Sequence, residues 1–326
     1  MYALRLVVPA FVGIVVISSN LLAAVVTHES FASDPLAGAW RTYGNSTLFA
    51  WNSTNENLEV TWDSRETNSY FYHPLGTILT KEDDFSFSFD LRLRDIGIGI
   101  DTNKPFTFQI AVGLLNLSNA TQPTFLRGTG INSPNIVEFD YFPDSGFGAT
   151  VSPTIISSNH QFGYSFNLFG LEVDDLYHVD MTYTASSRTL KTTMTRNGAL
   201  FGPMEDIVLA SNFSDFRVNA LSISSFTDAG QDPQFSGSIL ANGIIDNVET
   251  TVPEPPLSPI VPRFTAGVWR TEFQSRAKWT YILERTTNFR DWTDVATAPG
   301  SGSILQLDDA APPPEGAYYR VRAERP

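Results

Sequence analysis

The chain contains no cysteine. This absence excludes disulfide bonds and thiol catalysis, so the folded protein must be held by packing alone. An extracellular protein without disulfides needs a sizeable hydrophobic core. With 326 residues, 42% of them hydrophobic, the chain can bury such a core, and its length allows roughly two domains.

Basic residues are scarce relative to acidic ones. The sequence has 21 Lys and Arg against 35 Asp and Glu, a formal net charge of −14. This excess of negative charge argues against partners such as nucleic acid and anionic membrane surfaces, because both recruit Lys and Arg. It does not disfavour sugars. The four histidines show no two-histidine metal spacing on one strand or helix.

A long hydrophobic run is absent everywhere except near the N-terminus. Residues 1–24 are typical of a signal peptide, with Arg5, an apolar run from Leu6 to Ile17, and small residues at Ala23 and Ala24. An uncleaved membrane anchor is the alternative, although the run is shorter than the ~20 residues that a span needs.

In either case we expect the rest of the chain to lie outside the cytoplasm. It would be secreted, periplasmic or on the cell surface, with no transmembrane span after signal removal. An exported chain without disulfides suits a bacterial protein best.

Aromatic residues, Gly and Pro are abundant, and they favour strands joined by tight turns. Aromatics make up 13% of the chain, with 22 Gly and 20 Pro. Phe85, Phe87 and Phe89 alternate with polar residues, as expected for a strand with one face on a core. Similar stretches recur over residues 28–251. The sequence therefore predicts an all-β protein whose main domain is a two-sheet antiparallel sandwich.

Residues 252–262 contain five prolines, which forbid a helix or central strand and favour an extended spacer. We expect a linker there, followed by a small C-terminal β module over residues 263–326. Trp269, Trp279 and Trp292 are the residues expected to form its core.

The most specific stretch runs from Glu138 to Asp144. In a strand, Glu138, Asp140 and Phe142 share one face. Two adjacent carboxylates repel unless they are exposed or are compensated by a cation or by hydrogen-bond donors. Calcium takes carboxylate and carbonyl oxygens, and a strand that ends in a turn containing proline can supply both. An ordinary strand with an exposed acidic face is the alternative.

This stretch resembles the start of the metal loop in legume-type, concanavalin A-like lectins. The resemblance implies a jelly roll over about residues 30 to 250, in a family architecture that lectins share with glucanases. It implies that Glu138 faces a transition metal, that Asp140 bridges to calcium, and that Phe142 offers its carbonyl. Asp144 stands where the family commonly has Asn. Ala149 and Thr154 replace two further metal ligands, which implies one calcium or none.

The C-terminal module resembles the small fibronectin-like β domains that end many large exported bacterial proteins. Tyr281 to Arg285, Trp292 and Tyr318 to Arg322 carry this likeness. The resemblance implies a spacer, a docking unit or a surface-association unit.

Aromatic side chains next to turns are candidates for stacking on sugar rings, and Tyr72, Tyr141 and Phe147 meet this condition. The leading hypothesis is a secreted, lectin-like protein that binds a glycan or polysaccharide and has no evident catalytic residues.

Two other functions stay open. A jelly-roll hydrolase of the Glu-x-Asp-x-x-Glu type would need Glu where Pro143 stands, and the shorter-spaced variant would need it at Phe142. A glycoside hydrolase or lyase could still draw its carboxylates from separate strands. A structural or adhesive cell-surface protein is the third hypothesis.

Overall fold

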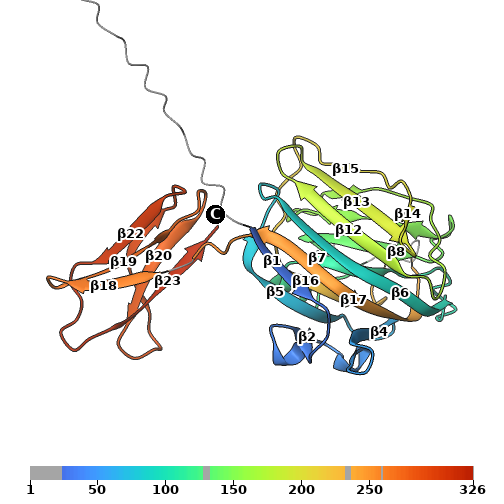
Figure 1. The fold of residues 1–326 in the computed structure, drawn as a ribbon, viewed down its shortest axis with the longest axis horizontal. Coiled ribbons are helices and arrows are strands. Elements are labelled where there is room, and N and C mark those ends of the chain that lie inside the picture. The colour runs from blue at the N-terminus through green and yellow to red at the C-terminus, as the bar shows by residue number, and fades with distance from the viewer. Residues whose placement is uncertain (1–23, 128–132, 232–235, 258–259, 326) are drawn as a thin grey trace, which may run out of the picture.

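Two large antiparallel sheets packed face to face form the main body of the protein (Figure 1). The computed structural model describes residues 24–127, 133–231, 236–257 and 260–325. The predicted all-β fold and antiparallel jelly-roll sandwich are confirmed. Residues 1–23, which hold nearly all of the predicted signal peptide, lie outside the described residues.

The first sheet, called sheet A, has the strand order β14-β13-β12-β6-β17-β4-β3, with β1 beside β17 and β15 beside β13. Its strands are β1 (Ala24–Glu29), β3 (Phe49–Asn52), β4 (Asn57–Asp63), β6 (Phe85–Ile98), β12 (Tyr177–Thr184), β13 (Thr189–Arg196), β14 (Ala199–Phe201), β15 (Ile207–Val208) and β17 (Ile239–Pro253).

The second sheet, sheet B, has the order β11-β10-β8-β7-β16-β5-β2, with β9 beside β8. Its strands are β2 (Arg41–Tyr43), β5 (Ser69–Leu79), β7 (Ile110–Leu115), β8 (Ile136–Phe142), β9 (Thr150–Val151), β10 (Thr154–Ile156), β11 (Phe162–Tyr164) and β16 (Val218–Ser225). Strand β8, which carries the acidic motif, therefore lies within the sheet and β11 lies at its edge.

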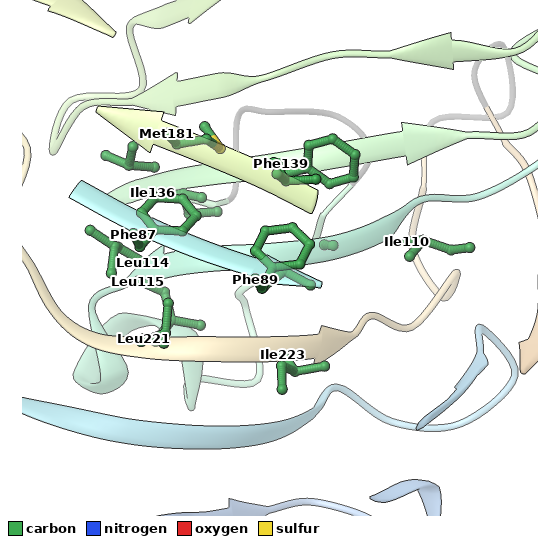
Figure 2. Close-up of a cluster of buried hydrophobic side chains, with 14 of the residues drawn as sticks. Phe87, Phe89, Ile110, Leu114, Leu115, Ile136, Phe139, Met181, Leu221 and Ile223 are labelled. Carbon is green, nitrogen blue, oxygen red and sulfur yellow. The ribbon is translucent and has the colours of Figure 1, made fainter. Parts of the chain in front are cut away.

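The core fills the space between the two sheets. Phe87 and Phe89 point inward from β6, as their alternation predicts, and both are fully buried. The ring of Phe89 meets that of Phe139 from β8 edge to face, with centroids 5.6 Å apart. Figure 2 shows these rings with Met181 and aliphatic side chains of β7, β8 and β16. Packing of alternate strand residues thus fixes which face of each strand points outward.

Helices are short in the described residues. They are α1 (Leu117–Ala120) and the 3-10 turns η1 (Pro35–Ala37) and η2 (Ser46–Leu48). Asn116 caps α1, because its side chain accepts a hydrogen bond from the backbone N–H of Asn119. The described chain contains no helix long and apolar enough to cross a membrane.

The C-terminal module, residues 261–324, consists of two small sheets. Sheet C has the order β18-β19-β22 and sheet D the order β21-β20-β23. Their strands are β18 (Val261–Thr265), β19 (Val268–Gln274), β20 (Thr280–Thr286), β21 (Thr293–Pro299), β22 (Ile304–Asp309) and β23 (Tyr318–Glu324). Strands occupy both ends of the predicted linker, since β17 continues to Pro253 and β18 begins at Val261.

The three tryptophans of the module differ in environment. Trp279 is buried in the core, and Trp269 packs at the rim of that core with its ring stacked on Tyr319 at 4.0 Å. Trp292 lies instead under the guanidinium of Arg320, 4.0 Å from the ring centroid. The expectation that all three form the core is therefore corrected for Trp292, whose ring is covered by a charged side chain.

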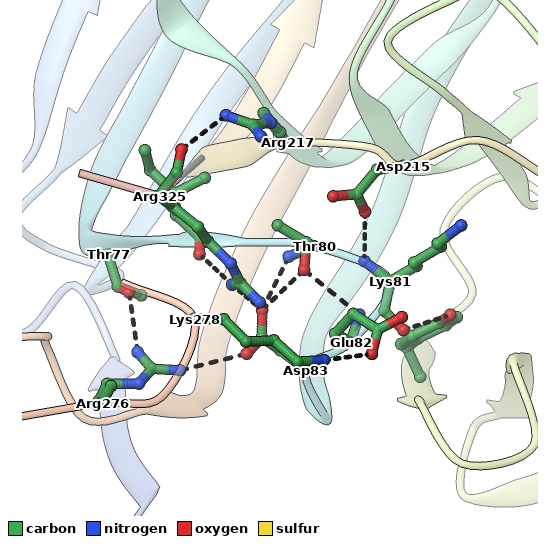
Figure 3. Close-up of polar contacts among 12 residues, drawn as sticks. Thr77, Thr80, Lys81, Glu82, Asp83, Asp215, Arg217, Arg276, Lys278 and Arg325 are labelled. Carbon is green, nitrogen blue, oxygen red and sulfur yellow. Dashed lines mark hydrogen bonds and ion pairs between the residues drawn. The ribbon is translucent and has the colours of Figure 1, made fainter. Parts of the chain in front are cut away.

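A buried carboxylate joins the module to the sandwich (Figure 3). Asp83 follows β5 and accepts hydrogen bonds from Arg276, at 3.1 Å, and from Arg325. All three side chains are at least nine-tenths buried. Both guanidiniums also lie within 6 Å of the Trp279 ring. Breaking such a buried cluster on one side leaves uncompensated charge.

Replacing Asp83 with Ala should lower the free energy of unfolding by about 3–5 kcal/mol, because Arg276 and Arg325 would stay buried without their carboxylate. Calorimetric unfolding measures this. Glu82→Ala is the matched control, because Glu82 is the neighbouring carboxylate in an exposed pair with Lys278. It should cost about 1 kcal/mol or less. Equal losses for the two variants would contradict the assigned role of Asp83.

Candidate functional site

One row of register partners crosses the outer face of sheet B. Each residue in it is paired with the next on the neighbouring strand, so all of their side chains lie on the same face. The row is Arg41, Tyr72, Ser222, Gly113, Glu138, Thr154 and Tyr164. Glu138 of the predicted metal motif therefore lies near the middle of this face, and Tyr72 and Tyr164 lie toward its opposite edges.

The middle of this face is covered by residues 116–127, which we call the covering segment. Tyr70 on β5 donates a hydrogen bond from its hydroxyl to the carbonyl of Ala120, and the amide of Asn68 donates to the carbonyl of Phe125. Gly113 permits close approach on the neighbouring strand, since a Cβ there would lie 2.4 Å from the Cα of Glu138. The face beneath the segment is consequently closed.

Arg127, at the end of the covering segment, binds both carboxylates of the motif. Its Nε donates to Oε1 of Glu138 at 2.5 Å and its Nη2 donates to Oδ2 of Asp140 at 2.7 Å. The side chains of all three residues are 4% exposed or less. One guanidinium thus donates a hydrogen bond to each of two buried carboxyl groups.

Burial determines the protonation of this cluster. Desolvation raises the pKa of the Glu138 carboxyl well above its ordinary value, and the neighbouring Asp140 charge raises it further. Desolvation also raises the pKa of Asp140, against the lowering effect of Arg127. Because one guanidinium carries one positive charge, the cluster is most stable when Glu138 keeps its proton.

The residues of the predicted metal site do not converge as calcium ligands. Glu138 and Asp140 direct oxygens to Arg127, and the exposed Asp144 accepts a hydrogen bond from the backbone N–H of Gly146. In the described part of the chain, no group of three or more His, Asp or Glu side chains is placed to share a metal ion. The guanidinium supplies the positive charge that the motif requires, so this arrangement does not fit a metal.

The three predicted stacking residues have separate environments. Tyr141 is 2% exposed and accepts a hydrogen bond from the backbone N–H of Leu171, so its predicted place on a binding surface is corrected. Its ring faces the core because it shares the inward face of β8 with Phe139. Tyr72 is half-buried on β5. Phe147 is 82% exposed.

Phe147 lies beside an aromatic surface that we did not predict. Phe162, Tyr164, Phe166 and Leu168 are all exposed, whereas Ser165 and Asn167 between them are buried. We call these four residues the aromatic strip. Phe166 meets the ring of Phe147 edge to face at 6.4 Å, and Phe162 lies 5.4 Å from Tyr164. Three aromatic rings and a leucine therefore lie in a row on the outer face of sheet B.

The strip reverses the usual pattern of a half-buried strand. Alternating aromatic residues normally face a core, so the pattern over residues 162–168 predicts that the rings point inward. Here the inward side is occupied by other residues, because a Cβ on Gly163 would lie 3.0 Å from Leu209 and 3.3 Å from Ile207. The small and polar residues at 163, 165 and 167 were the only sequence feature that could have indicated the outward direction of the rings.

Comparisons with known proteins add a likeness to lectins. No family model matches the chain, and no curated protein matches it. Similar solved structures include a peanut lectin with a nine-residue peptide, which is 16% identical with a TM-score of 0.41 and covers 69% of this chain and 98% of that one. They also include winged bean acidic lectin with methyl-α-D-galactose, which is 11% identical with a TM-score of 0.43 and covers 71% of this chain and 99% of that one.

Lectin I from Ulex europaeus with a methyl glycoside of α-L-fucose is likewise similar, at 12% identity and a TM-score of 0.43, covering 70% of this chain and 98% of that one. These similarities assign no residue role in this chain. The fibronectin-like resemblance of the C-terminal module stays a prediction.

The raised pKa of Glu138 predicts a pH dependence of stability. The stability that its protonated carboxyl contributes is fully present below the ordinary value of 4.5. It is lost as pH rises through the folded-state pKa, with a slope of up to about 1.4 kcal/mol per pH unit. Glu138→Gln should remove this loss and be more stable than wild type above that pKa. Chemical unfolding at a series of pH values measures the effect.

Glu249→Gln serves as the control, because Glu249 is an exposed carboxylate on β17. This variant should follow the wild-type pH profile. A Glu138→Gln profile parallel to wild type would mean that Glu138 is ionised in the folded protein, and it would contradict the protonation assigned to the cluster.

Proposed function

We propose that this protein binds carbohydrate chains on the aromatic strip. The proposal rests on the row formed by Phe162, Tyr164 and Phe166, each at least 43% exposed, with Leu168 beside them. Exposed aromatic rings in a row are costly in water unless they serve a contact. Ring faces offer flat apolar area at a low entropy cost, which suits the apolar faces of sugar rings.

The strip favours a chain over a single sugar. Alternate residues of an extended segment are about 6.6 Å apart, so the aromatic strip from residue 162 to residue 168 spans roughly 20 Å. Such a length can contact several sugar units at once. Phe147 extends this surface through its ring contact with Phe166.

The charge of the protein favours an uncharged polysaccharide. With a net charge of −14, the chain would repel an acidic polymer over long range at low ionic strength. We therefore propose a lectin-like binding protein for neutral polysaccharide, without a catalytic role for Glu138 or Asp140, whose carboxylates lie beneath the covering segment. The proposal keeps the expectation from the sequence that the protein is exported, to the periplasm, the cell surface or the medium.

Tyr164→Ala and Phe166→Ala should each weaken polysaccharide binding about tenfold, which corresponds to about 1.4 kcal/mol, because each removes a ring from the strip. Migration in gels that contain soluble glucans, mannans or xylans measures this affinity. Phe264→Ala is the matched control, since Phe264 is 66% exposed but belongs to β18 of the C-terminal module.

Unchanged retention in both strip variants would reject the proposed site. Failure of the wild-type protein to bind any polysaccharide of the panel, together with stable recovery in envelope fractions that free sugars do not disturb, would favour the adhesive hypothesis. An exposed apolar patch of this kind also suits a protein partner.

The lectin resemblance implies calcium at the acidic motif. We propose instead that the guanidinium of Arg127 occupies the place of the cation between Glu138 and Asp140. Excess calcium and chelator should then leave the melting temperature unchanged, because a ligand raises stability only if it binds the folded state. A calcium-dependent rise that disappears in Asp140→Ala would contradict this proposal.

A further inference from the structure

A second recessed surface lies on the opposite side of the sandwich, on the outer face of sheet A. It is a cleft of about 460 Å³, within the size range of small-molecule sites. Strands β6 and β17, which lie side by side in Figure 1, supply most of its lining. The lining from these two strands comprises Asp90, Arg92, Arg94, Ile244, Asp246 and Asn247.

Asp90 is held rigidly in this cleft. Its Oδ1 lies 2.7 Å from Nδ1 of His178 on β12, and its Oδ2 accepts a hydrogen bond from the amide of Asn247 at 2.8 Å. The register of β17 against β6 shifts between Asp246 and Glu249, and Asn247 adopts φ 47° there. This bulge turns the Asn247 amide outward beside Asp90. Bulges of this kind commonly re-aim a side chain at a site.

The cleft is lined by charges of both signs. Asp90 and Asp246 are register partners on neighbouring strands and supply two carboxylates. Arg92 and Arg94 supply two guanidiniums, and that of Arg94 is also paired with Glu59 at 3.3 Å. An anionic ligand would meet the carboxylates and a cationic ligand would meet the guanidiniums. A neutral ligand rich in hydroxyl groups can use both, because its hydroxyls donate to carboxylates and accept from guanidiniums.

A further observation fits such a ligand. Leu176 and Ile244 give the cleft an apolar part against which C–H groups can pack. The face of a sugar ring carries such C–H groups between its hydroxyls, so the polar and apolar parts of the lining suit one ligand.

We propose that this cleft is a second ligand site, which takes a neutral saccharide of one or two rings through hydroxyl contacts to Asp246 and Arg92. It does not depend on the aromatic strip, which lies on the other sheet. The protein would then hold a polysaccharide on sheet B and a short saccharide on sheet A.

Saturation-transfer NMR of the full chain tests this site. The probes are glucose, galactose, mannose and disaccharides of these sugars, with glucuronic acid and glucosamine as charged counterparts. We expect transfer to at least one neutral sugar, weakened at least about tenfold in Asp246→Ala and in Arg92→Ala. Asp246→Asn keeps the side-chain shape and guards against a folding defect, and each variant is compared with wild type by thermal unfolding.

Asp180→Asn is the matched control, because Asp180 is a carboxylate on β12 of the same sheet, outside the cleft. It should bind as wild type does, and so should Phe166→Ala. Four results would overturn the proposal. The first three are no neutral sugar bound at millimolar concentration, equal binding in the cleft variants, and tighter binding of a charged sugar. The fourth is loss of the signal in Phe166→Ala alone, which would place binding on the strip.

Discussion

The buried ion cluster of Arg127, Glu138 and Asp140 is the interaction on which the outer face of sheet B depends. Burying three ionisable groups is costly. The cost is offset because Glu138 keeps its proton and one guanidinium donates to both carboxyl groups, at 2.5 and 2.7 Å. This contact holds the end of the covering segment against β8. The middle of the face is therefore closed, and open contact area remains toward the β11 edge.

The same arrangement separates the parts of the molecule that serve structure from those that face a partner. Glu138 and Asp140 contact Arg127 and are part of the packing. The rings of Phe162, Tyr164 and Phe166 stay exposed because Gly163 leaves room for Leu209 and Ile207 on the inner side. On the opposite sheet, the bulge at Asn247 forms a polar cleft. Asp83 joins the C-terminal module to this frame through two arginines.

The alternation of residue types correctly predicted which side chains of a strand share a face. Phe85, Phe87 and Phe89 face the core as their alternation requires, and Glu138 shares a face with Asp140. Sequence could not identify Arg127 as their partner, because that contact arises only when the covering segment folds over the sheet. Tyr141 was assigned to the surface from its neighbouring turn, although its parity with Phe139 already placed it inward. The strip was missed because tertiary packing from the 207–209 segment decides which side of β11 is buried.

Hydroxyl-radical footprinting of the whole protein, with and without a bound polysaccharide, reports every exposed ring at once and so tests whether the aromatic strip is the binding surface. We expect protection of Phe147, Phe162, Tyr164 and Phe166, with Phe264 and Phe289 unchanged. Binding that leaves these four rings fully reactive and protects another face would show that the polysaccharide does not bind on the aromatic strip.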